Sequence, residues 1–448
     1  MMLSPGVVVA ELGSSAVLLN TGSPAAAYVS PTALGWLQGQ PPAPEHHDQH
    51  AHCLTQWRSA GLVSSGHAST APSGPSGSGA LEAQAAGLTT LPGHPVLVVA
   101  MSDACGFCGQ LTADLAANTS CLARLGASVL LVDPTGTRLL GRSVYTPAYP
   151  GLTRLGQDAA RQGTPTAVLL SPGRPPEVRT GFAEVSHALM TLSGADPHAT
   201  VVEAPTSCSV NVAAAPVDAV LTARVGGTRL GIAVRGPEAR RIAEEAAGAV
   251  PEDGYTPVTL TLERPETLHL LFRGGELLAR ARTPEGLRQV LDSVLAGYAR
   301  YATAERGEIP LLCGAAVREG GDAVLFPRGW MSDLVTRARQ LDRAGWRLRP
   351  EPYTLLRSAP DTATLHLPGP AGTGRPGPAV TAVLTQVPET GPAPTRPRLL
   401  ASIVNWIARP ATTDAVHTLA AALRPVPVLA GTWQEAVTHL RRSGQADA

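Results

Sequence analysis

The sequence has 448 residues, which is enough for two to four domains. Its 35 basic and 35 acidic side chains balance, and this argues against a general nucleic-acid or membrane-surface binder. Every one of those basic residues is arginine, so chemistry that needs a lysine amine, such as a Schiff base, is excluded. The N-terminus lacks a basic start and a long apolar run, and no stretch approaches the roughly 18 apolar residues of a membrane span. We therefore expect a cytoplasmic protein with no membrane or nucleic-acid partner.

Residues 1–66 have the pattern of a small α+β unit. VVVAEL and SAVLLN are strand-like runs separated by a hairpin signal, and SPTALGWLQG and CLTQWRSAGLV predict two short helices. This pattern resembles the PqqD-like recognition domain of pathways for ribosomally made, modified peptides (RiPPs). The resemblance implies that a leader peptide binds by adding a strand to the edge of the sheet. A winged-helix-like or other structural module fits the same pattern.

Between these two helices lies the polar stretch EHHDQHAHC, which ends at Cys53. Its four histidines, together with that cysteine, could hold a metal ion. An insertion this polar is more often a solvated loop, and we therefore assign no metal-binding residue to the chain.

Residues 67–92 are rich in Gly, Ser and Pro and predict a flexible linker. Residues 93–195 then alternate between strand and helix patterns, which predicts a partly parallel sheet covered by helices. The expected strands are HPVLVVAM, ASVLLVD, TPTAVLLSP and PEVRTGF. The expected helices are CGQLTADLAANTSCLARL, LTRLGQDAARQ and VSHALMTLS.

Cys105 and Cys108 lie where the first of these strands ends and the first helix begins. A cysteine in the first turn of a helix faces unsatisfied N–H groups and the positive end of the helix dipole, and both favour the thiolate. Cys105 is therefore the expected nucleophile, and Cys108, one turn later, can resolve a mixed disulfide. Half a zinc site would need a second Cys or His pair, and none is nearby at suitable spacing. A purely structural Cys-x-x-Cys is the alternative.

SDACGFCGQL, followed later by QGTPTAVLLSPG, resembles the thioredoxin superfamily, closest to its branch involved in cytochrome and methylamine-dehydrogenase maturation. The resemblance covers residues 93–195. It implies that Cys105 attacks, that Cys108 resolves, that Pro165 is a cis-proline and that Thr164 contacts the substrate peptide. Phe107, between the two cysteines, is assigned to the same substrate-binding surface. Val99 stands where many thioredoxins bury an acid, so no carboxylate is expected to deprotonate the second cysteine.

Residues 205–445 predict a third, larger α/β domain. IPLLCGAAVREGGDAVLF, a following helix and AGWRLRPEPYTLL resemble the HPr kinase/phosphorylase-like family of bacterial peptide clusters. The family has a Gly-rich phosphate loop with a lysine, and paired acids for magnesium. Here the loop is Pro327–Asp333 without those glycines or the lysine, Glu351 and Pro352 replace the acids, and Cys313 replaces a usual histidine. We expect a degenerate kinase fold without ATP chemistry.

The predicted fold class is thus α/β multidomain, with a PqqD-like unit, a thioredoxin fold and an HPr kinase-like domain in that order. The first functional hypothesis is an accessory protein of RiPP maturation with thiol–disulfide oxidoreductase activity and no cofactor. The second is a non-catalytic scaffold that recognises the leader of a precursor peptide and presents it to a separate modifying enzyme. Both hypotheses name a precursor peptide and a modifying enzyme as partners, and only the first requires the two cysteines.

Overall fold

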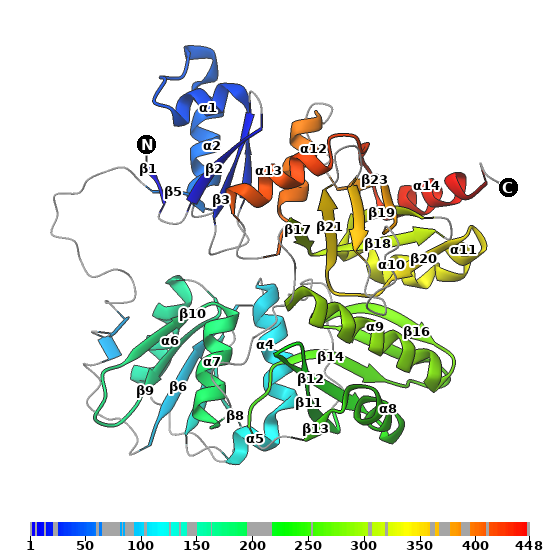
Figure 1. The fold of residues 1–448 in the computed structure, drawn as a ribbon. Helices are drawn as coiled ribbons and strands as arrows, with labels where there is room; N and C mark the ends of the chain where they lie inside the picture. Colours follow the sequence, from blue (N-terminus) through cyan, green and yellow to red (C-terminus); the bar gives the residue numbers. More distant parts are fainter. Residues whose placement is uncertain are drawn as a thin grey trace. The chain divides into compact units, whose positions relative to one another are not determined.

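The computed structural model is a mixed α/β protein with several sheets, as expected (Figure 1). The chain divides into two compact units, residues 1–68 with 296–448 and residues 69–295. Within the residues that the structure describes, no helix is both long and apolar enough to cross a membrane. The described residues are 2–4, 7–12, 15–20, 26–59, 62–64, 81–82, 84–85, 94–102, 105–124, 127–133, 136–140, 150–162, 164–194, 217–251, 254–302, 307–318, 321–358, 363–366, 377–386, 395–408 and 412–445.

The N-terminal part of the first unit contains a three-stranded antiparallel sheet in the order β2-β3-β4. One face of this sheet packs with two helices around Trp36 and Trp57. Ser30 begins the first of these helices, because its hydroxyl accepts a hydrogen bond from the Ala33 N–H at 3.2 Å. The elements are β1 (Met2–Leu3), β2 (Val7–Leu12), β3 (Ser15–Asn20), β4 (Ala26–Val29), α1 (Pro31–Leu37), η1 (Pro44–His46), α2 (His47–Ser59) and β5 (Val63–Ser64), which pairs with β1.

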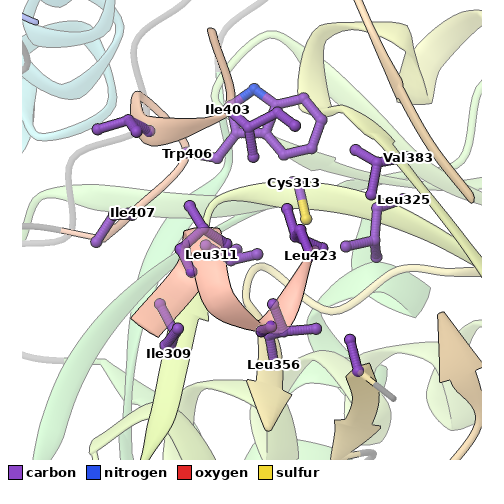
Figure 2. Packing of buried hydrophobic residues seen from close by; sticks show 14 of the residues in the cluster. Ile309, Leu311, Cys313, Leu325, Leu356, Val383, Ile403, Trp406, Ile407 and Leu423 are labelled. Atoms are coloured by element: carbon purple, nitrogen blue, oxygen red, sulfur yellow. The ribbon is translucent and has the colours of Figure 1, made fainter. Parts of the chain in front are cut away.

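The C-terminal part of the same unit is built on an eight-stranded mixed sheet. Its apolar core gathers side chains from the strands and from the segment around Trp406, as Figure 2 shows for Leu311, Cys313 and Leu325. The strands are β17 (Glu308–Leu311), β18 (Cys313–Arg318), β19 (Asp322–Pro327), β20 (Trp346–Arg349), β21 (Thr354–Ser358), β22 (Ala363–His366), β23 (Ala379–Thr385) and β24 (Val428–Ala430). The helices are η2 (Arg328–Trp330), α10 (Met331–Thr336), α11 (Ala338–Arg343), α12 (Arg396–Val404), α13 (Thr413–Ala422) and α14 (Trp433–Gln445).

The two parts of this unit share one hydrophobic core. Ala10, Val17 and Leu19 of the N-terminal sheet are fully buried in the same cluster as residues of α12 and α13. Because successive side chains of a strand point to opposite faces, Leu18 enters the core under α1 and α2 while Leu19 enters the core shared with the C-terminal helices. Both faces of the three-stranded sheet are therefore covered.

The second unit contains a five-stranded sheet in the order β10-β9-β6-β7-β8. Strands β6 and β7 are parallel, while β9 runs antiparallel to both β6 and β10. Helices α4 and α7 pack on one face and α6 on the other, where Gly156 is required because a Cβ would lie 2.5 Å from the Val132 side chain. The elements are β6 (Val96–Ala100), α4 (Gly106–Ala117), α5 (Thr119–Arg124), β7 (Ser128–Asp133), β8 (Gly136–Leu140), α6 (Pro150–Gln162), β9 (Thr166–Leu170), β10 (Glu177–Thr180) and α7 (Phe182–Leu192).

A six-stranded sheet in the order β13-β11-β12-β14-β15-β16 completes the second unit. The hairpin of β11 and β12 is followed by α8, and the chain then returns as β14, parallel to β12. The elements are β11 (Ala219–Val225), β12 (Thr228–Arg235), α8 (Pro237–Ala247), β13 (Val250–Pro251), β14 (Val258–Glu263), β15 (His269–Arg273), β16 (Glu276–Ala281) and α9 (Pro284–Ala302).

Two predicted domain boundaries differ from the division of the structure into two compact units. The region 205–445, expected as one domain, falls partly in each unit, with the division inside α9 between Leu295 and Ala296. Within the predicted linker 67–92, Leu81 and Ala85 are buried in the core beneath α6, and Gln84 bonds to Asp158 at 2.9 Å. This short segment therefore packs as part of the fold. The remaining linker residues lie outside the described part of the chain.

Candidate thiol–disulfide site

Cys105 lies at the start of helix α4, as the sequence predicts. It is the N-cap residue, with extended backbone, and its sulfur accepts a hydrogen bond from the Cys108 N–H at 3.3 Å. The same side chain donates a hydrogen bond to the carbonyl oxygen of Thr164 at 3.2 Å. The fold thus brings Cys105 and Thr164 into contact across 59 positions of sequence.

The Thr164–Pro165 peptide bond is cis, and it immediately precedes strand β9. Pro165 is buried, and its carbonyl oxygen accepts a hydrogen bond from the Gly181 N–H at 2.8 Å. This bond ties the proline to the residue that precedes helix α7. Gly181 has a φ of +96°, a conformation that favours glycine because it has no Cβ.

Phe107 stacks on Phe182, the first residue of α7, with ring centroids 6.3 Å apart and an interplanar angle of 25°. Phe182 is fully buried, whereas Phe107 is half-buried. Phe107 was predicted as part of the substrate-binding surface, whereas Phe182 was expected only as the last residue of the strand PEVRTGF. In the structure that strand ends at Thr180 and Phe182 begins α7, and no local sequence signal shows that its ring meets the motif.

Cys108 lies behind Cys105 in the apolar core, with only 2% of its surface exposed. Burial raises the pKa of the Cys108 thiol to about 12, and its hydrogen bond with Cys105 and the charge of that residue act in the same direction. Val99 is fully buried in this core. Cys108 is therefore a protonated thiol near neutral pH, and both cysteines are free thiols.

Because Cys108 is buried and Cys105 is only half-buried, we predict that an alkylating reagent modifies the two thiols at different rates. At pH 8 a thiol with a pKa of about 12 is ionised in only about one molecule in 10⁴, and only the thiolate reacts. Iodoacetamide should therefore modify Cys105 and spare Cys108 in the native chain between pH 7 and 9. Mass spectrometry of labelled peptides measures both rates, with the denatured chain as the control. Equal rates at the two cysteines would contradict this buried position of Cys108.

The histidine-rich stretch spans the end of the 3-10 helix η1 and the start of helix α2. The rings of His46 and His50 pack against Trp36, the latter edge-on at 5.0 Å between centroids. Burial raises the pKa of Cys53 in the same helix. Among the described residues, no group of three or more His, Cys, Asp or Glu side chains is arranged to hold a metal ion.

The segment that was compared with a phosphate loop contains the 3-10 helix η2. Trp330 is buried there, and Arg328 donates a hydrogen bond to the carbonyl oxygen of Glu351. The Glu351 carboxylate in turn forms an ion pair with Arg349, whose Nε lies 3.1 Å from it. Cys313 is fully buried, and burial raises its pKa to about 12. The Glu351 carboxylate is thus bound by an arginine of its own chain.

The class of protein that the described residues define is a mixed α/β chain with a dithiol motif at a helix start, beside a cis-proline. Comparison of the sequence and the structure with family models, curated proteins and solved structures found no match.

Proposed function

We propose that this chain is a thiol–disulfide exchange protein that acts in the maturation of a ribosomally made peptide, with Cys105 as nucleophile and Cys108 as resolving thiol. The observation that carries the proposal is the 3.2 Å hydrogen bond from Cys105 Sγ to the carbonyl oxygen of Thr164, beside cis-Pro165. A nucleophilic thiol and an extended backbone segment then meet at one point. A peptide disulfide that pairs with this segment would present its sulfur to Cys105.

The sheet order supports the same assignment. The strands β7-β6-β9-β10, with β6 and β7 parallel and β9 and β10 antiparallel to their neighbours, follow the order of the thioredoxin fold. In this order the central strand β6 leads directly into the cysteine helix, and β9 begins after the cis-proline. Strand β8 is then an addition at one edge.

The exchange step balances as follows. The Cys105 thiolate attacks one sulfur of a substrate disulfide, the substrate S–S bond breaks, and the other substrate sulfur leaves as a thiolate that takes up a proton. Cys108 then loses its proton and attacks Cys105, which releases the second substrate thiol. The substrate gains two electrons, and the chain holds a Cys105–Cys108 disulfide. A dithiol reductant must reduce this disulfide for turnover, and the reverse sequence would oxidise a substrate dithiol.

Formation of the mixed disulfide at Cys105 makes the later attack by Cys108 easier. Part of the raised pKa of Cys108 comes from its hydrogen bond with Cys105 and from the charge of that residue. Both disappear when Cys105 enters a mixed disulfide, so the pKa of Cys108 falls at the moment when its thiolate is needed. No buried carboxylate at Val99 is required for this effect.

The peptide context follows from the resemblance of the N-terminal sheet to a leader-binding domain. Both faces of that sheet are covered, which leaves its edge strands β2 and β4 as the places where a peptide could add a strand. The alternative function, a non-catalytic scaffold that presents a leader to a modifying enzyme, is favoured by the self-paired Glu351 of the kinase-like part. The cysteines decide between the two functions.

The deciding experiment measures exchange and binding in parallel. The reduced full chain is mixed with a synthetic peptide that contains one intramolecular disulfide, and loss of that disulfide is followed by mass spectrometry. The parent chain should reduce the peptide stoichiometrically, while the double variant Cys105→Ser, Cys108→Ser should not. A parent chain that leaves the disulfide intact would favour the scaffold function.

A further inference from the structure

The segment Tyr255–Val258, which leads into strand β14, is bound by side chains of α4 and of the C-terminal ends of α4 and α7. The Tyr255 N–H donates to Ser193 Oγ at 2.9 Å, and the Val258 N–H donates to Asp114 Oδ1 at 3.0 Å. Asn118 binds the backbone between them through both ends of its amide, with Oδ1 accepting from the Thr256 N–H at 3.2 Å and Nδ2 donating to the Thr256 carbonyl at 2.9 Å. Four main-chain groups are thus satisfied by three side chains.

The same segment has an aromatic anchor. Tyr255 is fully buried in the core cluster that contains Cys108, Cys121 and Leu111. Such burial of a large aromatic ring removes about 150–250 Å² from water and makes it a strong contact. The other side of the segment is held by the six-stranded sheet, where Thr256 Oγ1 accepts from Arg229 at 2.9 Å and lies 3.2 Å from Thr222 Oγ1.

Main-chain hydrogen bonds combined with one deep aromatic anchor are the means by which proteins bind extended peptides. We propose that the C-terminal ends of α4 and α7 form a second peptide-binding site, and that its ligand is the chain's own segment Tyr255–Val258. The chemistry of the site selects a segment that begins with an aromatic residue and offers main-chain hydrogen-bonding groups at the next three positions. Asp114, Asn118 and Ser193 recognise the backbone, and the core around Cys108 accepts the ring.

The internal ligand acts on the cysteine pair through one helix. α4 has Cys105 at its N-cap and Asn118 at its C-cap, and its 12 residues span about 18 Å. Tyr255 and Cys108 lie in the same buried cluster, so release of the segment would open the core beside the resolving thiol. This consequence for reactivity rests on the proposed exchange function, whereas the binding site itself does not.

The buried carboxyl of Asp114 can remain bound to the Val258 N–H without carrying a charge. Burial raises its pKa well above the ordinary value, and the hydrogen bond from Val258 only partly opposes this. The carboxyl is therefore stabilised in its neutral form, and the contact does not depend on a buried charge. An asparagine, which keeps an acceptor oxygen for the Val258 N–H, can replace it.

The first test opens the site in the full chain with Asn118→Ala. We expect amide exchange of Tyr255–Val258 and iodoacetamide labelling of Cys108 both to accelerate at least about tenfold, with little change at Cys105. Thr412→Ala, which removes a helix-capping hydrogen bond in the other unit, is the matched control and should change neither measurement. Unchanged exchange and labelling in Asn118→Ala would overturn the proposal.

The second test uses a ligand in trans. Tyr255→Ala in the full chain vacates the aromatic pocket, and the probe is the acetylated, amidated peptide Gly-Tyr-Thr-Pro-Val-Thr, which copies residues 254–259. The probe should bind this variant, restore slow Cys108 labelling, and bind at least tenfold more weakly when Asn118→Ala is added. Failure of the probe to bind a folded Tyr255→Ala chain would contradict the site. Neither test requires turnover, so loss of the exchange function would leave the result interpretable.

Discussion

Replacing Cys105 with serine is expected to reduce the rate of disulfide exchange by at least about a thousandfold, because a serine hydroxyl stays protonated and cannot attack a disulfide. Cys108→Ser should instead stop the reaction after the first step and accumulate a mixed disulfide between Cys105 and the peptide. The two variants therefore differ in product as well as in rate. Non-reducing mass spectrometry of the mixture identifies the trapped species.

The different outcomes expected for Cys105→Ser and Cys108→Ser follow from the positions of the two thiols. Cys105 is half-buried at the helix start, whereas Cys108 is in the core with its pKa raised to about 12. Cys313 provides a matched control, because it is a buried thiol whose pKa is also raised to about 12 but which lies in the other unit. Cys313→Ser should leave the exchange rate unchanged. A mixed disulfide that formed on Cys108 in Cys105→Ser would reverse the assignment of the two roles.

The candidate site could be predicted from sequence because its parts are local signals. Cys105 follows a run of apolar residues and precedes a helix pattern, and Pro165 stands at the start of another apolar strand. The alternation of strands and helices then implies a sheet that places these two points at one edge. Phe182 was missed because its contact with Phe107 depends on where a later helix begins, and no periodicity encodes that.

The contacts of Tyr255 are a second example of long-range packing that could not be predicted from the sequence. In sequence, Tyr255 to Val258 is a short Pro-containing stretch between a helix and a strand, with no feature of a core segment. Its burial arises from side chains more than 60 positions away, on α4 and α7. The spacing of apolar residues along α4 predicts which side of the helix is buried, but it does not predict which part of the chain packs against that side.

Domain boundaries were harder to predict than elements, because boundaries depend on which apolar faces share a core. The predicted break after residue 66 treats the N-terminal sheet as separate from the C-terminal region. In the structure, Val17 and Leu19 on one face of β3 are buried together with Leu419 and Leu423 in and after α13. SAVLLN is apolar on both faces, which indicates that both faces of the strand are buried. The sequence does not identify the part of the chain that packs on the second face.

This shared core predicts a specific coupling between distant parts of the chain. Leu19→Ala should destabilise the first unit by about 2–5 kcal/mol, the usual range for removing a fully buried leucine side chain. Because Leu19 lies in the cluster that includes α12 and α13, amide protection should fall in those C-terminal helices as well as in β3. Native-state hydrogen exchange on the full chain measures both regions in one experiment.

Leu18→Ala is the matched control, since it makes the same substitution one residue earlier in the same strand at a side chain that is also fully buried. Leu18 faces the other core, with Trp36 and Trp57, so its loss should lower protection first in α1 and α2. Exchange in α13 that responds equally to both substitutions would show that the unit unfolds as a whole. Exchange in α13 that responds to neither would show that the N-terminal sheet is independent of the C-terminal helices. A selective response to Leu19→Ala means that a peptide bound at the edge of the sheet would also stabilise α12 and α13, because binding energy at the sheet is shared through that core.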